Sequence, residues 1–152
     1  MFPVEIFQQT LSKLTTILQH HAIRFHLTGG LTGTVYGEPR MTQDIDVVVD
    51  PVQMTLVGES LLNSLEGSVF LFNPDVVRSA IRDGGMFQLL DQAEALKLDV
   101  YVREMIPGEL SRSERVEVFE GQWLPVVSRV DAAISKLIWI GKGSHKSRRD
   151  LR

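Results

Sequence analysis

Apolar residues along the chain recur first with a helical period and then with a strand period. Residues 3–21 carry large apolar side chains every three or four positions, which predicts an amphipathic helix. These side chains are Phe7, Leu11, Leu14 and Leu18. Residues 23–28 (IRFHLT) and 44–50 (DIDVVVD) are short runs that predict two strands, the second buried and rich in β-branched residues. Residues 31–37, between them, are expected to form one or two helical turns.

Two Asx-Pro pairs indicate where further helices begin. Asp50-Pro51 and Asn73-Pro74 each place a side chain that can cap a helix before a proline at the first helical position. Apolar residues keep helical spacing after the first pair, at Met54, Val57, Leu61 and Leu65. The helix after the second pair should end at Gly84-Gly85.

The second half of the chain predicts two hairpins and a helix. Four apolar runs, joined in pairs by short polar turns, are expected to form the hairpins. The runs are residues 87–91, 96–102, 115–119 and 123–127. Ser128 and Asp131 have the spacing of a capping box and begin a helix with a stripe of apolar residues that should be buried. The stripe is Val130, Ala133, Ile134, Leu137 and Ile138. The basic residues 144–152 are expected to be helical.

This order of elements predicts an α/β (α+β) domain with a small mixed β-sheet flanked by helices. Its 152 residues are enough for one domain, and the sequence shows no repeat, linker or low-complexity tract. We expect residues 1–127 to form the core and residues 128–152 to form a short, basic, helical C-terminal segment packed on it.

Composition excludes several classes of protein. No apolar run approaches the ~20 residues needed to span a membrane, and the N-terminal residues do not read as a signal peptide. The chain has no cysteine, which excludes disulfides and thiolate chemistry. The four histidines lack metal-ligand spacing and are expected to be surface or strand residues. We therefore expect a soluble cytoplasmic protein.

Charge is unevenly distributed along the chain. Residues 1–128 contain 9 Lys/Arg and 17 Asp/Glu, whereas residues 129–152 contain 7 and 2. The net charge of −3 argues against a general nucleic-acid binder. The basic end is either a solvated helix face or a phosphate-binding wall that faces an acidic, metal-binding centre.

Three aspartates are the candidate metal ligands. Asp44 and Asp46 alternate with apolar residues on one predicted strand, so they share a face and lie about 6–7 Å apart. Their mutual repulsion favours a bound cation, and carboxylate oxygens suit Mg²⁺. Asp99 lies with Lys97 on the polar face of another predicted strand, and it joins the pair if the two strands are neighbours. Each aspartate by itself is also typical of a solvent-facing strand.

Gly29 and Gly30 are the candidate phosphate-binding residues. They follow a predicted strand and precede a predicted helix, where backbone N–H groups point outward and attract anions. Glycine lets a phosphate approach the backbone closely. A tight strand-to-helix turn explains the pair equally well.

The stretch LTGGLTGTVYGEPRMTQDIDVVV resembles the signature of the nucleotidyltransferase superfamily with the polymerase-beta-like fold. Its GG…YG.PR.T.DID wording is similar to the branch that includes abortive-infection and toxin–antitoxin nucleotidyltransferases. The resemblance implies that Asp44, Asp46 and Asp99 bind Mg²⁺, with Asp99 nearest the attacking hydroxyl. It also implies that Gly29 and Gly30 hold the triphosphate. Many family members have serine in place of Gly30.

Three further residues are carried over from the same resemblance. Arg40 either contacts a phosphate, fixes its loop or is a surface residue. Lys136 corresponds to a lysine that contacts nucleotide phosphate in toxin-like relatives, and Asp150 resembles an acid in the basic motif that follows.

The main hypothesis is a Mg²⁺-dependent nucleotidyltransferase that moves a nucleoside monophosphate from an NTP, such as ATP, to a hydroxyl. The toxin-like resemblance favours RNA (such as tRNA) or a protein side chain as the acceptor, and it would imply a cognate antitoxin. A non-catalytic nucleotide-binding or partner-binding domain of the same fold is the alternative. Transfer to a small molecule is a third hypothesis.

Overall fold

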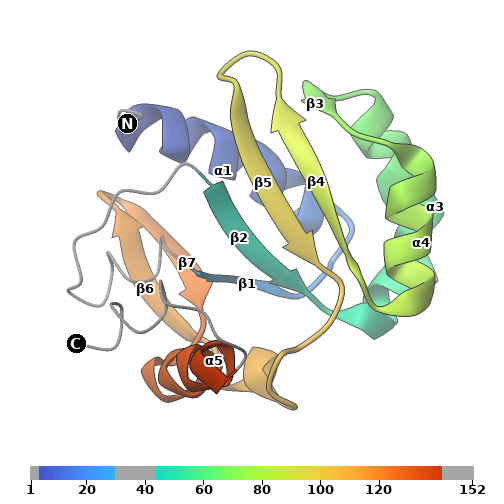
Figure 1. Ribbon diagram of the computed structural model, residues 1–152. Helices are drawn as coiled ribbons and strands as arrows, with labels where there is room; N and C mark the ends of the chain where they lie inside the picture. Colours follow the sequence, from blue (N-terminus) through green and yellow to red (C-terminus); the bar gives the residue numbers. More distant parts are fainter. Residues whose placement is uncertain (1–3, 30–43, 142–152) are drawn as a thin grey trace.

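The computed structural model describes residues 4–29 and 44–141 (Figure 1). Residues 1–3, 30–43 and 142–152 lie outside this description. The helical turns expected at residues 31–37 and the helix expected at residues 144–152 fall in these gaps, so both stay predictions.

A seven-stranded mixed sheet has the strand order β3-β4-β5-β2-β1-β7-β6 (Figure 1). The strands are β1 (Phe25–Thr28), β2 (Asp44–Val49), β3 (Phe70–Leu71), β4 (Met86–Asp91), β5 (Leu96–Tyr101), β6 (Glu114–Phe119) and β7 (Gln122–Val126). β2 runs parallel to β5 and β1 runs parallel to β7, whereas the other neighbours are antiparallel. Both predicted hairpins, β4–β5 and β6–β7, are present. The predicted mixed α/β fold is therefore confirmed.

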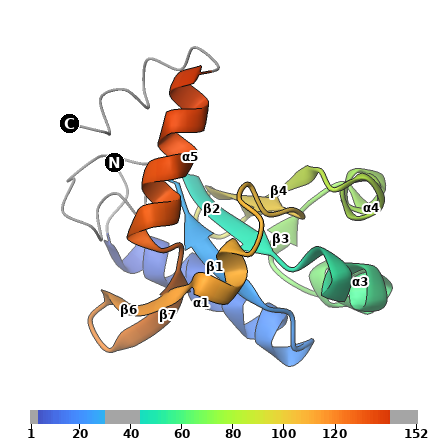
Figure 2. The same cartoon turned by 90° about the horizontal axis from the view of Figure 1, so that it is seen from below.

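Helices cover one face of this sheet. The helical elements are α1 (Val4–His20), α3 (Pro51–Glu66), α4 (Pro74–Asp83), the 3₁₀ helix η1 (Glu109–Arg112) and α5 (Arg129–Gly141). α1, α3 and α4 bury their apolar residues against the sheet in one continuous core. Figure 2 shows α5 on the other side of β1 from α1. No described helix is long and apolar enough to span a bilayer.

Strand alternation gives the sheet one apolar face and one polar face. Ile45, Val47 and Val49 of β2 are fully buried, as are Leu96 and Leu98 of β5. Because successive side chains point to opposite faces, the aspartates between them point away from α1 and α3. The core therefore fixes which face of the sheet carries the polar residues.

The predicted helix starts are present and have the expected hydrogen bonds. Asp50 accepts bonds from the backbone N–H groups of Val52 and Gln53, at 2.9 and 3.1 Å. Asn73 caps α4 in the same way. At the other end of α4, Gly84 adopts the left-handed conformation that closes a helix.

The prediction of a buried stripe on α5 is wrong. Val130, Ile134 and Leu137 are 68%, 39% and 59% exposed. Ala133 is also exposed, and Ile138 is half-buried. Helical spacing shows which residues share a face, but burial requires a second element on that face. α5 packs against the core through Ala132, which is not part of the predicted stripe.

Candidate active site

Asp46 and Asp99 are neighbours on the polar face of the sheet. β2 and β5 run parallel, and their register pairs Asp46 directly with Asp99. Adjacent strands lie about 4.8 Å apart, and register partners point to the same face. Both aspartates are half-buried, and Oδ1 of Asp99 is shielded from solvent. The structure thus brings together two of the three predicted carboxylates.

Gly29 lies directly against Asp46. It follows β1 with φ at +76°, a conformation that side chains rarely adopt. A Cβ atom at this position would overlap Oδ2 of Asp46 and lie 2.8 Å from its Cγ. Space and backbone conformation both require glycine, so the first residue of the Gly-Gly pair lets the chain pass beside a carboxylate.

The remaining predicted residues are only partly described. Asp44 begins β2 and pairs in register with Lys97, but its side chain lies outside the description. Gly30, Arg40 and Asp150 also fall outside the described residues. Lys136 lies on α5 and is half-buried. The roles expected for these residues stay predictions.

The two described carboxylates suit an oxygen-binding cation. Asp46 and Asp99 carry like charges on adjacent strands, and partial burial strengthens their repulsion. A cation would relieve it, and Mg²⁺ is bound in proteins by one or two carboxylates together with water and substrate phosphates. Among the described side chains, no group of three or more acids or histidines could hold a metal. A third carboxylate would come from a side chain outside the description, and Asp44 is the predicted one.

Two residues that sequence reasoning missed extend this site across the sheet. Thr28 of β1 pairs in register with Asp46, and Gln88 of β4 pairs with Asp99. Thr28, Asp46, Asp99 and Gln88 therefore form one polar row over four strands. Neither Thr28 nor Gln88 carries a sequence signal, because its place in the row depends on strand order and register.

A buried histidine lies two residues before Thr28 on β1, so its side chain is on the same face of the sheet. His26 is fully buried, and its Nε2 lies 3.0 Å from Oε1 of Glu109. Its Nδ1 lies 2.6 Å from the hydroxyl of Ser113. The other Glu109 oxygen accepts the backbone N–H of Ile106. These bonds fix η1 to the sheet, a role that the spacing of the histidines did not reveal.

An ion pair connects η1 with the start of α5. Nε and Nη2 of Arg112 donate to the two carboxylate oxygens of Asp131, at 2.9 and 3.0 Å. These bonds hold the pKa of the Asp131 carboxyl below its ordinary value, against the opposite effect of burial. The hydroxyl of Ser128 accepts the backbone N–H of Asp131, as the capping-box prediction requires. These contacts fix the start of α5, and therefore the position of Lys136 on that helix.

Searches with the sequence found no matching family model and no curated relative. Solved structures do match over nearly the whole chain. One is the lincosamide antibiotic adenylyltransferase LnuA with lincomycin bound, at a TM-score of 0.61 and 12% identity. The match covers 98% of this chain and 94% of LnuA.

A second match is TM1012 of Thermotoga maritima, a proposed nucleotidyltransferase, at a TM-score of 0.64 and 16% identity. It covers 97% of this chain and 93% of TM1012. Identities this low are evidence for the fold alone. The chain has the nucleotidyltransferase fold.

Proposed function

We propose that this protein is a Mg²⁺-dependent nucleotidyltransferase. The observation that carries the proposal is the Asp46–Asp99 pair on adjacent parallel strands, with the backbone of Gly29 packed against Asp46. A carboxylate pair beside a glycine turn is the arrangement that a metal-bound triphosphate needs. The fold shared with LnuA and TM1012 supports the same reaction class.

The reaction would transfer a nucleoside monophosphate from an NTP to a hydroxyl. The acceptor oxygen attacks the α-phosphorus, the bond from that phosphorus to the bridging oxygen breaks, and pyrophosphate leaves. Asp99 would accept the proton of the attacking hydroxyl. The N–H groups of Gly29 and Gly30 would hold the triphosphate, with Arg40 and Lys136 as further phosphate contacts.

Asp44, Asp46 and Asp99 are the residues that would hold Mg²⁺. Bound there, the metal would neutralise phosphate charge and make the acceptor hydroxyl easier to deprotonate. Asp150 would take part only if the segment beyond α5 approaches the same face. The backbone of Gly29 would contact the donor directly, because there is no room for a side chain at this position beside Asp46.

Two classes of acceptor have separate support. The resemblance of residues 27–50 to toxin-like enzymes supports tRNA or a protein side chain, and with it a cognate antitoxin. The likeness to LnuA, a lincosamide adenylyltransferase, supports a small molecule. A nucleotide-binding domain without catalysis is the alternative to both, motivated by glycine at position 30, where many family members have serine.

The test offers each α-labelled NTP to the protein and a cell extract, with and without Mg²⁺. We expect label to appear in an acceptor only with Mg²⁺. The double substitution Asp46→Asn with Asp99→Asn should reduce transfer by at least roughly 100-fold. The matched control replaces Asp75 and Asp83 of α4, whose side chains are 94% and 62% exposed, by asparagine.

Unchanged transfer in the Asp46/Asp99 double variant would refute the proposed site. Tight NTP binding by the unmodified protein, with no pyrophosphate release in any extract, would favour the non-catalytic alternative.

A further inference from the structure

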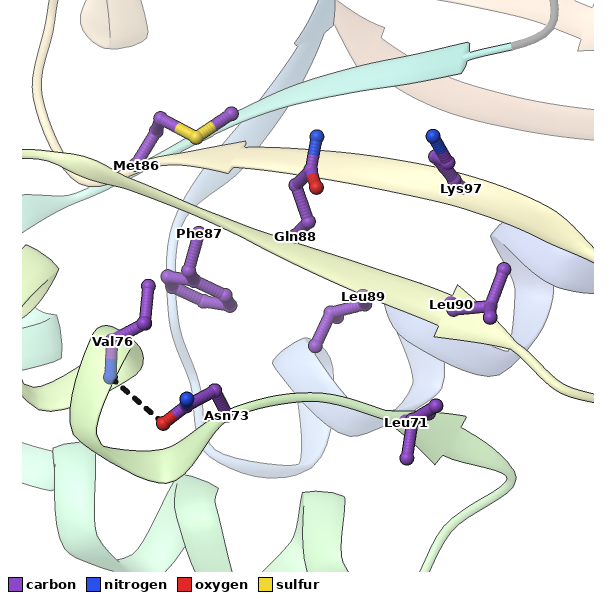
Figure 3. A pocket seen from close by; sticks show the side chains of 9 residues that line it. All are labelled: Leu71, Asn73, Val76, Met86, Phe87, Gln88, Leu89, Leu90 and Lys97. Carbon is purple, nitrogen blue, oxygen red and sulfur yellow. Dashed lines mark hydrogen bonds between the residues drawn. The ribbon is translucent and has the colours of Figure 1, made fainter.

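A hollow of about 420 Å³ lies where the sheet ends, along β4 (Figure 3). We call it the edge pocket. Its wall on one side is the segment from β3 to the start of α4, and on the other side it is β4 together with one residue of β5. The lining includes Leu71, Asn73, Val76, Met86, Gln88 and Lys97. Cavities of this size hold small ligands in many proteins.

The edge pocket adjoins the candidate active site on the side away from Gly29. Gln88 lines the pocket and is the register partner of Asp99. Lys97 lines it too, and it precedes Asp99 by two residues on β5, so both lie on the polar face. Figure 3 shows the side chains of Gln88 and Lys97 on one side of β4 and Asn73 and Val76 on the other, so the pocket extends around the edge of this strand. The order across the sheet is Gly29, Asp46, Asp99, Gln88 and then the pocket.

The geometry of nucleotidyl transfer indicates from which side of the aspartate pair the acceptor approaches. In an in-line displacement, the attacking oxygen enters opposite the leaving pyrophosphate. The triphosphate is assigned to the Gly29 side of the aspartate pair, so the acceptor should approach from the β4 side. Resting on the proposed function, we propose that the edge pocket binds the body of the acceptor while its hydroxyl reaches Asp99.

The lining specifies the chemistry of this acceptor. Leu71, Val76 and Met86 are 55%, 46% and 36% exposed, so they offer apolar surface to a ligand. Lys97 is exposed and forms no ion pair with the described side chains, and Gln88 adds an amide. The acceptor is therefore a compact hydroxyl compound with an apolar part. It also carries a group that accepts hydrogen bonds or is negatively charged.

The same features disfavour macromolecular acceptors. An extended peptide could pair with the outer edge of β4 only over a few residues, because β3 already pairs with Leu90 and Asp91. Asn73 and Val76 occupy the space beside the remaining edge of β4. RNA binding depends on several cationic contacts to phosphates, and Lys97 is the one cation in the pocket lining.

The first experiment tests binding without turnover. A library of low-molecular-mass alcohols, phenols and hydroxy acids is screened against the protein by amide chemical shifts. We expect hits that shift Gln88 and Lys97, with affinity at least about tenfold weaker for Val76→Trp, which fills the pocket. The control is Val52→Trp on α3, a site 68% exposed and absent from the pocket lining, which should bind hits unchanged. A library with no hits, or with hits only elsewhere, would overturn the proposal.

The second experiment separates this proposal from the proposed function. NTP affinity, measured by calorimetry, should be equal in Val76→Trp, Val52→Trp and the unmodified protein. Label transfer to tRNA or protein at an unchanged rate in Val76→Trp would overturn the pocket assignment but uphold nucleotidyl transfer. Failure of the unmodified protein to bind NTP would instead refute the proposed function itself.

Discussion

At the scale of single residues, Gly29 is held by two separate constraints. Its φ of +76° disfavours any side chain, and a Cβ would meet the carboxylate of Asp46. Gly121 offers a matched control, because its φ is +79° and nothing lies within 4 Å of an added Cβ. Replacing each glycine by alanine therefore separates backbone strain from the clash with the carboxylate.

We expect Gly121→Ala to lower the free energy of unfolding by about 1–2 kcal/mol, the cost of a left-handed alanine. Gly29→Ala should cost clearly more and should also reduce nucleotidyl transfer. Urea unfolding of both variants measures the difference. Adding Asp46→Ala to Gly29→Ala should restore part of the lost stability. Equal costs for the two single variants would show that the Gly29–Asp46 contact is unimportant.

The sequence predicted Asp46 and Asp99 because strand alternation is local. Ile45 and Val47, on either side of Asp46, fix the buried face of β2, and therefore the face that carries the carboxylate. The pairing of Thr28 and Gln88 with these aspartates depends on strand order, which no local pattern contains. The same holds for Glu109, a buried acid that is explained by its contacts with His26 and with the backbone N–H of Ile106.

At the scale of elements, a buried carboxylate ties α1 to the β4–β5 hairpin. Oδ2 of Asp91 accepts bonds from the hydroxyl of Thr10 and the ammonium of Lys13, at 2.7 and 2.8 Å. Burial by itself would raise the pKa of Asp91. The hydrogen bonds from Lys13, Thr10 and the turn backbone outweigh that effect, so its pKa lies below the ordinary value.

The sign of this shift predicts acid sensitivity. The contribution of Asp91 to stability is complete above the pKa of the unfolded chain, about 3.9, and is lost as pH falls through the lower folded pKa. Asp91→Asn should therefore flatten the acid limb of a stability profile measured by urea unfolding between neutral pH and the acid transition. Asp75→Asn, on an exposed side chain, is the control. An unchanged acid limb in Asp91→Asn would contradict this account.

Capping signals predicted helix starts well because a cap lies within three residues of the backbone groups that it binds. Asp50, Asn73 and Ser128 all accept the expected N–H groups. Burial of α5 could not be predicted in this way, because it depends on which distant element covers the helix. The buried residue of α5 is Asp131, which sequence spacing assigned only to a cap.

At the scale of the whole molecule, the sheet separates the apolar core from the candidate active site. The face toward α1, α3 and α4 contains the apolar core, and the other face carries two like charges on adjacent strands. We expect this pair to lower the stability of the protein when no cation is bound, because repulsion between half-buried carboxylates opposes folding. Binding of a cation and a nucleotide should recover that stability.

The effect of Asp99→Asn on thermal stability should therefore be opposite in the absence and in the presence of Mg²⁺ and NTP. In the presence of a chelator, removing one charge should raise the midpoint of thermal unfolding, because the repulsion from Asp46 is lost. With Mg²⁺ and NTP at 100 times the dissociation constant, the unmodified protein should gain about 2.7 kcal/mol, and the variant should gain less. Asp83→Asn, on an exposed side chain of α4, should respond to ligand like the unmodified protein. If Asp99→Asn is destabilising with chelator and gains full stability with ligand, the carboxylate pair neither repels nor binds the metal, and the proposed site is wrong.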